Sequence, residues 1–241
     1  MERSKKKHVD VLPESRLTRS IAAVLRLFYG RKVSGIENIS PSEPAVFVCN
    51  HGRISGPVTA ILHLPVRVRP WINACMLDRE EATATMMNTF RDKLTFLGPG
   101  FKRKLLHGLS GLICHILNSF GPIPVHKGDP RKSVGTITLG AEALERGESL
   151  LIFPEKPGDR YDEESYKEFN SGFAALGRAY YKRTGRNLKF YPVFSDSSSR
   201  RFIIGQSVSF DPDNGSREEK MRITAELRER MMALKSLCNE Q

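Results

Sequence analysis

The chain has 241 residues, of which 39% are hydrophobic and 27% are charged. This composition is ordinary for a globular protein and excludes an intrinsically disordered chain. The formal net charge of +11 attracts anions, and nucleic acids, acidic lipid headgroups and phosphorylated metabolites are all candidates. Because the sequence lacks a helix-turn-helix, zinc-finger or RNA-recognition motif, nucleic acid is the least favoured of these partners.

The cysteines and the hydrophobic runs restrict the compartment. The four cysteines form no Cys-x-x-Cys pair and have no metal-ligand spacing, which argues against a zinc site or a disulfide framework and for a reducing, cytoplasmic compartment. The first ten residues are not followed by the apolar core of a secretory signal. No run of eighteen apolar residues occurs, so we expect no membrane-spanning helix.

We divide the chain into a basic N-terminal segment, residues 1–40, and an α/β domain, residues 41–241. Within the first part, residues 13–29 predict an amphipathic helix with Arg16, Arg19 and Arg26 interleaved among apolar positions. Such a helix either lies in the interface of an anionic membrane or packs on its own domain. We expect residues 3–29 to bind anionic vesicles, and the packed alternative stays open.

The second part predicts alternating strands and helices. Strands are expected at 45–49, 66–72, 150–153, 188–194 and 201–210, and helices at 102–118, 130–146, 172–182 and from 216 onward. The wide apolar face of 102–118 favours a core helix, with a wall of an acyl-chain groove as the alternative. The alternation predicts an α/β layered sandwich with a mostly parallel sheet flanked by helices.

His51 is the first candidate for chemistry, because it follows the predicted buried strand 45–49. Reactive groups in open α/β sheets gather at the carboxyl ends of strands. A neutral imidazole there can take a proton from a hydroxyl as that oxygen attacks an acyl carbonyl. A histidine in this position is more often structural, so the assignment needs support from other motifs.

Four short blocks and a tail occur in a fixed order. Residues 50–58 contain Asn-His and, after four intervening residues, Gly-Pro; residues 120–128 read Phe-Gly-Pro-Ile-Pro-Val-His-Lys-Gly; residues 151–155 end in Phe-Pro-Glu; residues 191–193 are Tyr-Pro-Val; and residues 204–208 are Ile-Gly-Gln-Ser-Val. Each block alone is weak, but the ordered set resembles the 1-acylglycerol-3-phosphate acyltransferase family from about residue 45 to 209.

The resemblance implies a glycerolipid acyltransferase-like fold and an O-acyltransferase of phospholipid synthesis. Such an enzyme moves a fatty acyl group from an acyl-CoA or acyl-carrier-protein thioester to a lysophosphatidate-like acceptor, without a metal or bound cofactor. It works as a peripheral protein at the inner membrane surface. The implied base is His51, and the implied binding residues for the phosphate-bearing acceptor are Lys127, Glu155, Lys156 and Arg160.

Two departures from the family pattern stand out. The aspartate that normally orients the catalytic histidine is replaced by Gly56, since Asn50 and Pro57 fix the register on both sides. After Phe-Pro-Glu, the family's Gly-x-Arg becomes Lys-Pro-Gly-Asp-Arg at residues 156–160. The candidate substitutes for the missing acid are Ser55, Asp78, Glu155 and Asp159. If none serves, the chain is a catalytically degenerate family member that binds lipid or membrane.

Overall fold

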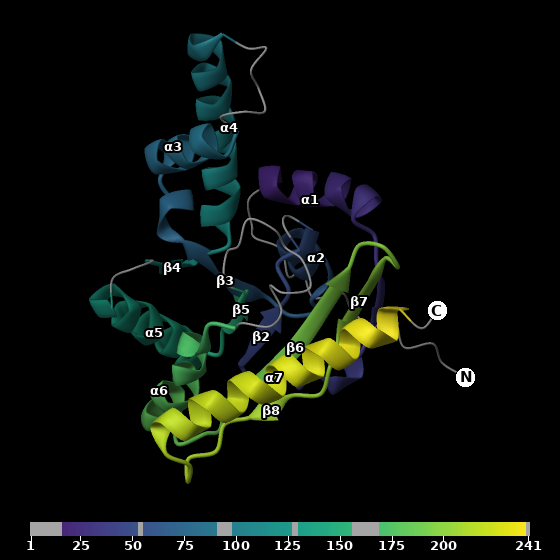
Figure 1. Ribbon diagram of the computed structural model, residues 1–241, viewed down its shortest axis with the longest axis vertical. Helices are drawn as coiled ribbons and strands as arrows, with labels where there is room; N and C mark the ends of the chain where they lie inside the picture. The colour runs from purple at the N-terminus through teal and green to yellow at the C-terminus, as the bar shows by residue number, and fades with distance from the viewer. Residues whose placement is uncertain (1–15, 53–54, 91–97, 127–129, 156–168, 240–241) are drawn as a thin grey trace.

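The computed structural model describes residues 16–52, 55–90, 98–126, 130–155 and 169–239. Its elements in chain order are α1 (Arg16–Phe28), β1 (Lys32–Ser34), β2 (Ala45–Cys49), α2 (Ser55–His63), β3 (Val68–Asn73), α3 (Arg79–Thr89), α4 (Pro99–Ser119), β4 (Ile123–Val125), α5 (Pro130–Glu145), β5 (Ser149–Ile152), α6 (Ala175–Thr184), β6 (Lys189–Asp196), β7 (Arg201–Ile204), β8 (Val208–Ser209) and α7 (Ser216–Asn239) (Figure 1). None of the helices in these ranges is long and apolar enough to cross a membrane.

All eight strands belong to one sheet in the order β1-β7-β6-β2-β5-β3-β4, with β8 beside β6. The central strands β6, β2, β5, β3 and β4 pair in parallel, and β1 pairs in parallel with β7. The antiparallel pairs are β6 with β7 and β6 with β8. The predicted mostly parallel sheet flanked by helices is therefore confirmed.

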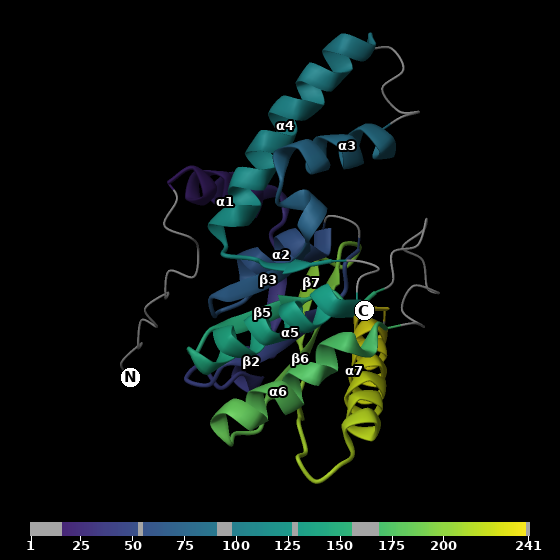
Figure 2. The same cartoon turned by 90° about the vertical axis from the view of Figure 1, so that its left-hand side faces the viewer.

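Both faces of the sheet are buried, as β2 shows. Val46 and Val48 point into a core shared with α5, α6 and α7, while Ala45, Phe47 and Cys49 point into a second core shared with the end of α2. Alternate side chains of a strand point to opposite faces, so five consecutive apolar residues fit a strand covered on both sides. Figures 1 and 2 show helices on both faces, with α7 lying across β6.

Three of the differences between the fold and the sequence expectations concern β1, the region after β6, and α4. The single strand expected at 201–210 is two strands, β7 and β8, because the chain leaves the ladder at Gly205, whose backbone passes Pro192 too closely for a side chain. The strand β1 adds residues 32–34 of the N-terminal segment to the sheet. The interpretation of 102–118 as a core helix is wrong, because α4 rises away from the sheet and exposes part of its apolar surface (Figures 1 and 2).

Candidate active site

The register of two neighbouring strands brings His51 and Glu155 together. Val48 of β2 lies opposite Ile152 of β5 in a parallel pair, and each of the two residues follows its strand partner by three positions. The backbone N–H of His51 donates a hydrogen bond of 3.0 Å to Oε1 of Glu155. Two residues 104 positions apart thus meet at the carboxyl edge of the sheet, where α/β enzymes place their reactive groups.

Asn50 fastens the end of β2 to the other neighbouring strand, β6. Its Nδ2 donates to the carbonyl oxygen of Ser195 at 3.0 Å, and its Oδ1 accepts from the Ser195 N–H at 2.7 Å. The Ser195 hydroxyl in turn lies 2.6 Å from Oγ1 of Thr59 in α2. All three side chains are buried, so the residue before His51 is fixed by both strand and helix. No sequence pattern predicts this role of Asn50, because its partner Ser195 lies 145 residues away.

His51 and Glu155 line a cavity of about 470 Å³ that is otherwise mainly apolar. The His51 ring packs edge-on against Phe153, with ring centroids 5.2 Å apart and planes at 72°. The apolar lining comes from α2, β3, the turn after β3, the foot of α4, α5 and the start of the helix after residue 170. It includes Ile61, Trp71, Met76, Leu117, Ile137 and Phe173. A few polar groups in an apolar cavity of this size are typical of small-molecule sites.

Burial controls the charge of Glu155. Withdrawal from water raises the pKa of its carboxyl to about 7, and the hydrogen bond from the His51 N–H opposes this rise only in part. A buried carboxylate is costly because the low-dielectric interior disfavours its charged form. Near neutral pH, Glu155 is therefore poised to gain or lose a proton, a property common among functional residues.

We expect this titration to appear in the stability of the protein. Above a pH of about 4.5 the unfolded chain carries the charge of Glu155, whereas the folded chain keeps the proton until about pH 7. The folded state binds more protons in this window, so its stability falls as the pH rises. Relative to Glu155→Gln, the wild type should lose on the order of 2–3 kcal/mol of unfolding free energy between pH 4.5 and 7. Urea denaturation at several pH values measures this difference.

Glu148 provides a matched control with the opposite sign. Burial acts to raise the pKa of this carboxyl, but hydrogen bonds from Arg69 and Arg146 outweigh it and hold the pKa below its usual value. Relative to Glu148→Gln, the wild type should therefore gain stability as the pH rises through the acid range. If both substitutions change stability with the same sign, burial does not govern Glu155.

The backbone at position 56 packs against the backbone of Asn50 and His51. Gly56 lies in the first turn of α2, and its N–H donates to the His51 carbonyl oxygen at 3.1 Å. A Cβ atom added at Gly56 would fall 2.1 Å from the Asn50 carbonyl oxygen and 2.5 Å from that of His51. Glycine is required here by close backbone approach, and an aspartate at this position would force the loop before it to move.

Of the four candidate substitutes for the missing acid, three lie among the described residues, and they differ in whether they line the cavity beside His51. The Ser55 hydroxyl donates to the carbonyl oxygen of Gly52 at 2.8 Å, and the Asp78 carboxylate caps α3 by accepting two backbone N–H groups. Neither of these residues lines the cavity, whereas Glu155 lines it together with His51. Asp159, the fourth candidate, lies outside the described residues.

Three of the predicted acceptor-binding residues also lie outside the described residues. These are Lys127, Lys156 and Arg160. Their assignment to an acceptor phosphate stays a prediction from the sequence. Val125, two positions before Lys127 in the sequence, and Glu155, one position before Lys156, both line the cavity.

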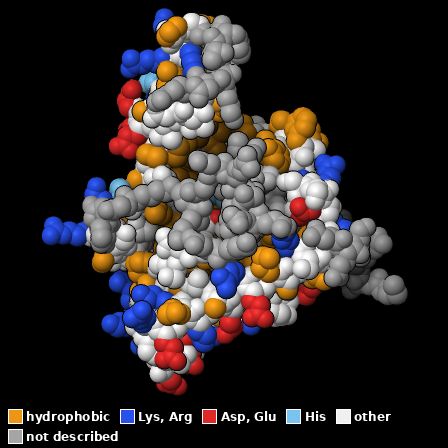
Figure 3. All heavy atoms as spheres, in the orientation of Figure 1, with side chains coloured by type: hydrophobic (Ala, Val, Ile, Leu, Met, Phe, Trp, Pro, Cys, Tyr) orange, Lys and Arg blue, Asp and Glu red, His pale blue; other side chains and the backbone are white. Residues whose placement is uncertain are grey.

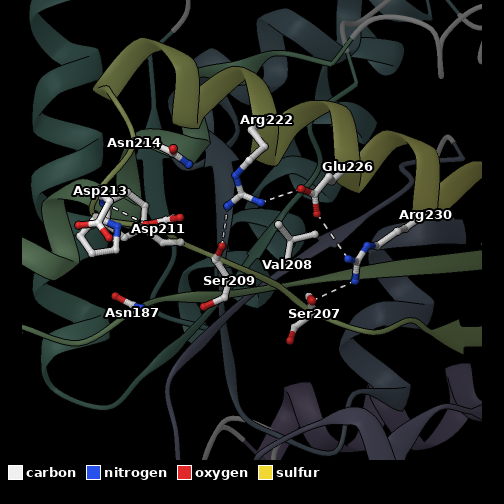
Figure 4. Close-up of a pocket in the computed structure, with 12 residues that line it drawn as sticks. Asn187, Ser207, Val208, Ser209, Asp211, Asp213, Asn214, Arg222, Glu226 and Arg230 are labelled. Atoms are coloured by element: carbon white, nitrogen blue, oxygen red, sulfur yellow. Dashed lines mark hydrogen bonds and ion pairs between the residues drawn. The ribbon is translucent and has the colours of Figure 1, made fainter.

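A second hollow, of about 660 Å³, lies between α7 and the segment around β8 (Figure 4). Its two central arginines already have partners. Arg222 donates to Glu226 at 2.6 Å and to the Ser209 carbonyl at 2.7 Å, and Arg230 contacts Glu226 at 3.4 Å and the Ser207 carbonyl at 2.9 Å. These bonds fasten α7 to β8, so we interpret this hollow as structural.

Comparisons with known proteins give a distant structural likeness and no sequence match. No protein-family model matches the chain, and neither does any curated protein sequence. Among solved structures, the chain is similar to the crystal structure of the 1-acyl-sn-glycerophosphate (LPA) acyltransferase, PlsC, from Thermotoga maritima. The two are 13% identical with a TM-score of 0.46, and the match covers 91% of this chain and 78% of that chain.

Proposed function

We propose that this chain is an O-acyltransferase that moves a fatty acyl group from an acyl thioester to the hydroxyl of a glycerophosphate-type acceptor. The observation that carries the proposal is the meeting of His51 and Glu155 at the carboxyl ends of adjacent parallel strands, beside a mainly apolar cavity. A base next to apolar volume suits a reaction in which a hydroxyl attacks a carbonyl at the end of a hydrocarbon chain. The ordered sequence blocks support the same reaction.

In this mechanism the imidazole of His51 takes the proton from the acceptor hydroxyl while the hydroxyl oxygen attacks the thioester carbonyl carbon. The resulting tetrahedral intermediate collapses by breaking the carbon–sulfur bond, and the imidazolium returns the proton to the departing thiolate. Glu155 is the proposed positioning residue, because its carboxylate holds the backbone of His51 and would stabilise an imidazolium nearby. The acyl chain would occupy the apolar part of the cavity.

The acceptor phosphate needs positive charge or N–H donors near the same edge of the sheet. Lys127, Lys156 and Arg160 are the proposed donors, because their segments join the cavity residues Val125 and Glu155. Lysine supplies a compact charge without the bidentate fork of arginine, so Lys127 would hold the phosphate less rigidly than an arginine would.

The experiment is an acyl-transfer assay of the purified full chain with lysophosphatidate and a panel of lysophospholipids, each with acyl-CoA and acyl-carrier-protein donors. We expect ester formation with at least one phosphate-bearing acceptor, and none with the matching acceptor that lacks the free hydroxyl. Product is measured by mass spectrometry. Absence of product with every pair, from protein that is folded by thermal melt, would contradict the proposal.

A second candidate function rests on Gly56. Because no carboxylate can occupy that position without moving the backbone, the residue that orients the histidine in related enzymes has no direct equivalent here. The chain would then bind lysophospholipid or fatty acid in the cavity without turnover. Lipid binding measured by calorimetry, together with a negative transfer assay, would favour this candidate.

A further inference from the structure

The helix α4 has a packed face and an exposed apolar face. The packed face repeats every four residues, at Lys102, Leu106, Ser110 and Cys114, all of which are buried. It meets α3 and the turn before it, with the Ser110 hydroxyl 3.3 Å from the sulfur of Met86. Figures 1 and 2 both show α4 rising away from the sheet with α3 beside it, so this contact holds the projecting helix upright.

The exposed face is a stripe of Phe101, Leu105, Leu109 and Leu112, which we call the α4 stripe. These side chains are exposed by 62%, 47%, 42% and 40%, and their spacing places them along one side of the helix. A contiguous row of large exposed apolar side chains on a soluble domain marks an interaction surface more often than a lone exposed leucine does.

The stripe continues toward a second helix with the same character. The foot of α4 touches α1, where the hydroxyls of Thr18 and Ser119 lie 3.1 Å apart. Four apolar side chains of α1 are also exposed, namely Leu17, Val24, Leu27 and Phe28. Figure 3 shows hydrophobic side chains gathered over α1 and in the hollow beneath α4, on the same side of the molecule.

The charge on these helices selects the partner. Neither α1 nor α4 contains an aspartate or glutamate, while α1 carries Arg16, Arg19 and Arg26 and α4 carries exposed Arg103 and Lys104. An apolar stripe on a helix whose own charged residues are all basic is the pattern of helices that lie in anionic bilayers. The acidic Glu80 belongs to the neighbouring α3, and its Oε1 lies 3.6 Å from Nδ1 of His107. A second copy of the chain fits poorly, since each copy has a net charge of +11 and the facing surfaces would repel.

We propose that the α4 stripe is a second membrane-docking surface, which enters the interface of an anionic bilayer beside α1. The stripe lies close to the cavity, because Leu117 at the foot of α4 and Met76 before α3 both line it. A bilayer bound there would lie next to the apolar site, so a lipid could move between them without crossing water. Docking itself does not depend on the proposed acyl transfer.

The test compares two double variants of the full chain with equal changes in charge. Leu105→Asp with Leu109→Asp interrupts the stripe, and Met232→Asp with Leu237→Asp changes two side chains of matching exposure on α7. We expect the α4 pair to weaken binding to vesicles of phosphatidylglycerol and phosphatidylcholine at least tenfold, and the α7 pair to weaken it no more than about twofold. Equal losses for both pairs, or no loss for the α4 pair, would overturn the proposal.

Tryptophan probes keep the test independent of any misfolding by aspartate. Leu105→Trp should shift its emission to shorter wavelength when anionic vesicles are added, whereas Leu237→Trp should not. An equal shift with vesicles of phosphatidylcholine alone would contradict the role of charge. A shift that follows protein concentration without lipid would identify a second copy as the occupant and overturn the proposal. Acyl transfer is not a readout, so failure of the proposed enzyme activity leaves this result interpretable.

Discussion

Replacing His51 with alanine should lower the rate of acyl transfer by about 10²–10⁴-fold, the usual contribution of a general base. The loss should appear mainly in kcat, because the imidazole acts on the reacting hydroxyl and the apolar walls of the cavity remain. Steady-state kinetics with varied acceptor and fixed thioester measure both parameters. Thermal melts of the variant and the wild type should agree within a few degrees, because the bond from the His51 N–H to Glu155 involves only the backbone of residue 51.

His115→Ala is the matched control for this substitution. It removes an exposed imidazole from α4 that does not line the cavity, so transfer should stay within about twofold of the wild type. Activity that survives the loss of His51 would show that another group takes the proton. If the chain is instead a non-catalytic binder, wild-type transfer is absent and His51→Ala leaves lipid affinity nearly unchanged.

Replacing Gly56 with alanine should destabilise the protein by about 2–4 kcal/mol, as strongly as a severe core substitution. The added Cβ would lie 2.1 Å from the carbonyl oxygen of Asn50, which is backbone and cannot swing aside like a flexible side chain. The backbone must then shift at His51 and at Asn50, whose side chain is hydrogen-bonded to Ser195. Urea denaturation measures the loss in unfolding free energy.

Gly108→Ala is the control, because it also lies in a helix and its added Cβ meets nothing within 4 Å. Alanine is the better helix former, so this variant should be as stable as the wild type or more stable by up to about 1 kcal/mol. For the same steric reason, Gly56→Asp should not create or raise acyl transfer, although aspartate stands at this position in the acyltransferase family that the sequence resembles. A Gly56→Asp variant that folds like the wild type and gains activity would refute the packing argument.

Much of the central architecture followed from the sequence. The run 45–49 has five apolar residues bounded by Pro44 and Asn50, and β2 occupies these five positions. A strand buried on both faces needs such an uninterrupted run, which is why local composition sufficed. The alternation of strands and helices likewise predicted the mostly parallel sheet.

Other elements were not predicted, because the sequence patterns that would indicate them are weak. The helix α3, Arg79–Thr89, lacks a one-sided apolar pattern, and its start is visible mainly in the Asp78 side chain that caps two backbone N–H groups. The strands β1 and β4 have three residues each, too few to show an alternation. The face of α4 that turned out exposed looked like core because periodicity records an apolar stripe without recording what covers it.

For the candidate site, the sequence by itself determined which residues stand at strand ends, His51 after one buried strand and Glu155 after another. Only the tertiary structure decided that these two strands are neighbours in a register that brings both residues to one cavity. It also decided that Ser195 holds Asn50 and that Gly56 is enclosed by backbone. The reason is physical: side-chain periodicity is a local property of the chain, whereas strand order, burial and the resulting pKa of Glu155 depend on contacts between residues more than a hundred positions apart.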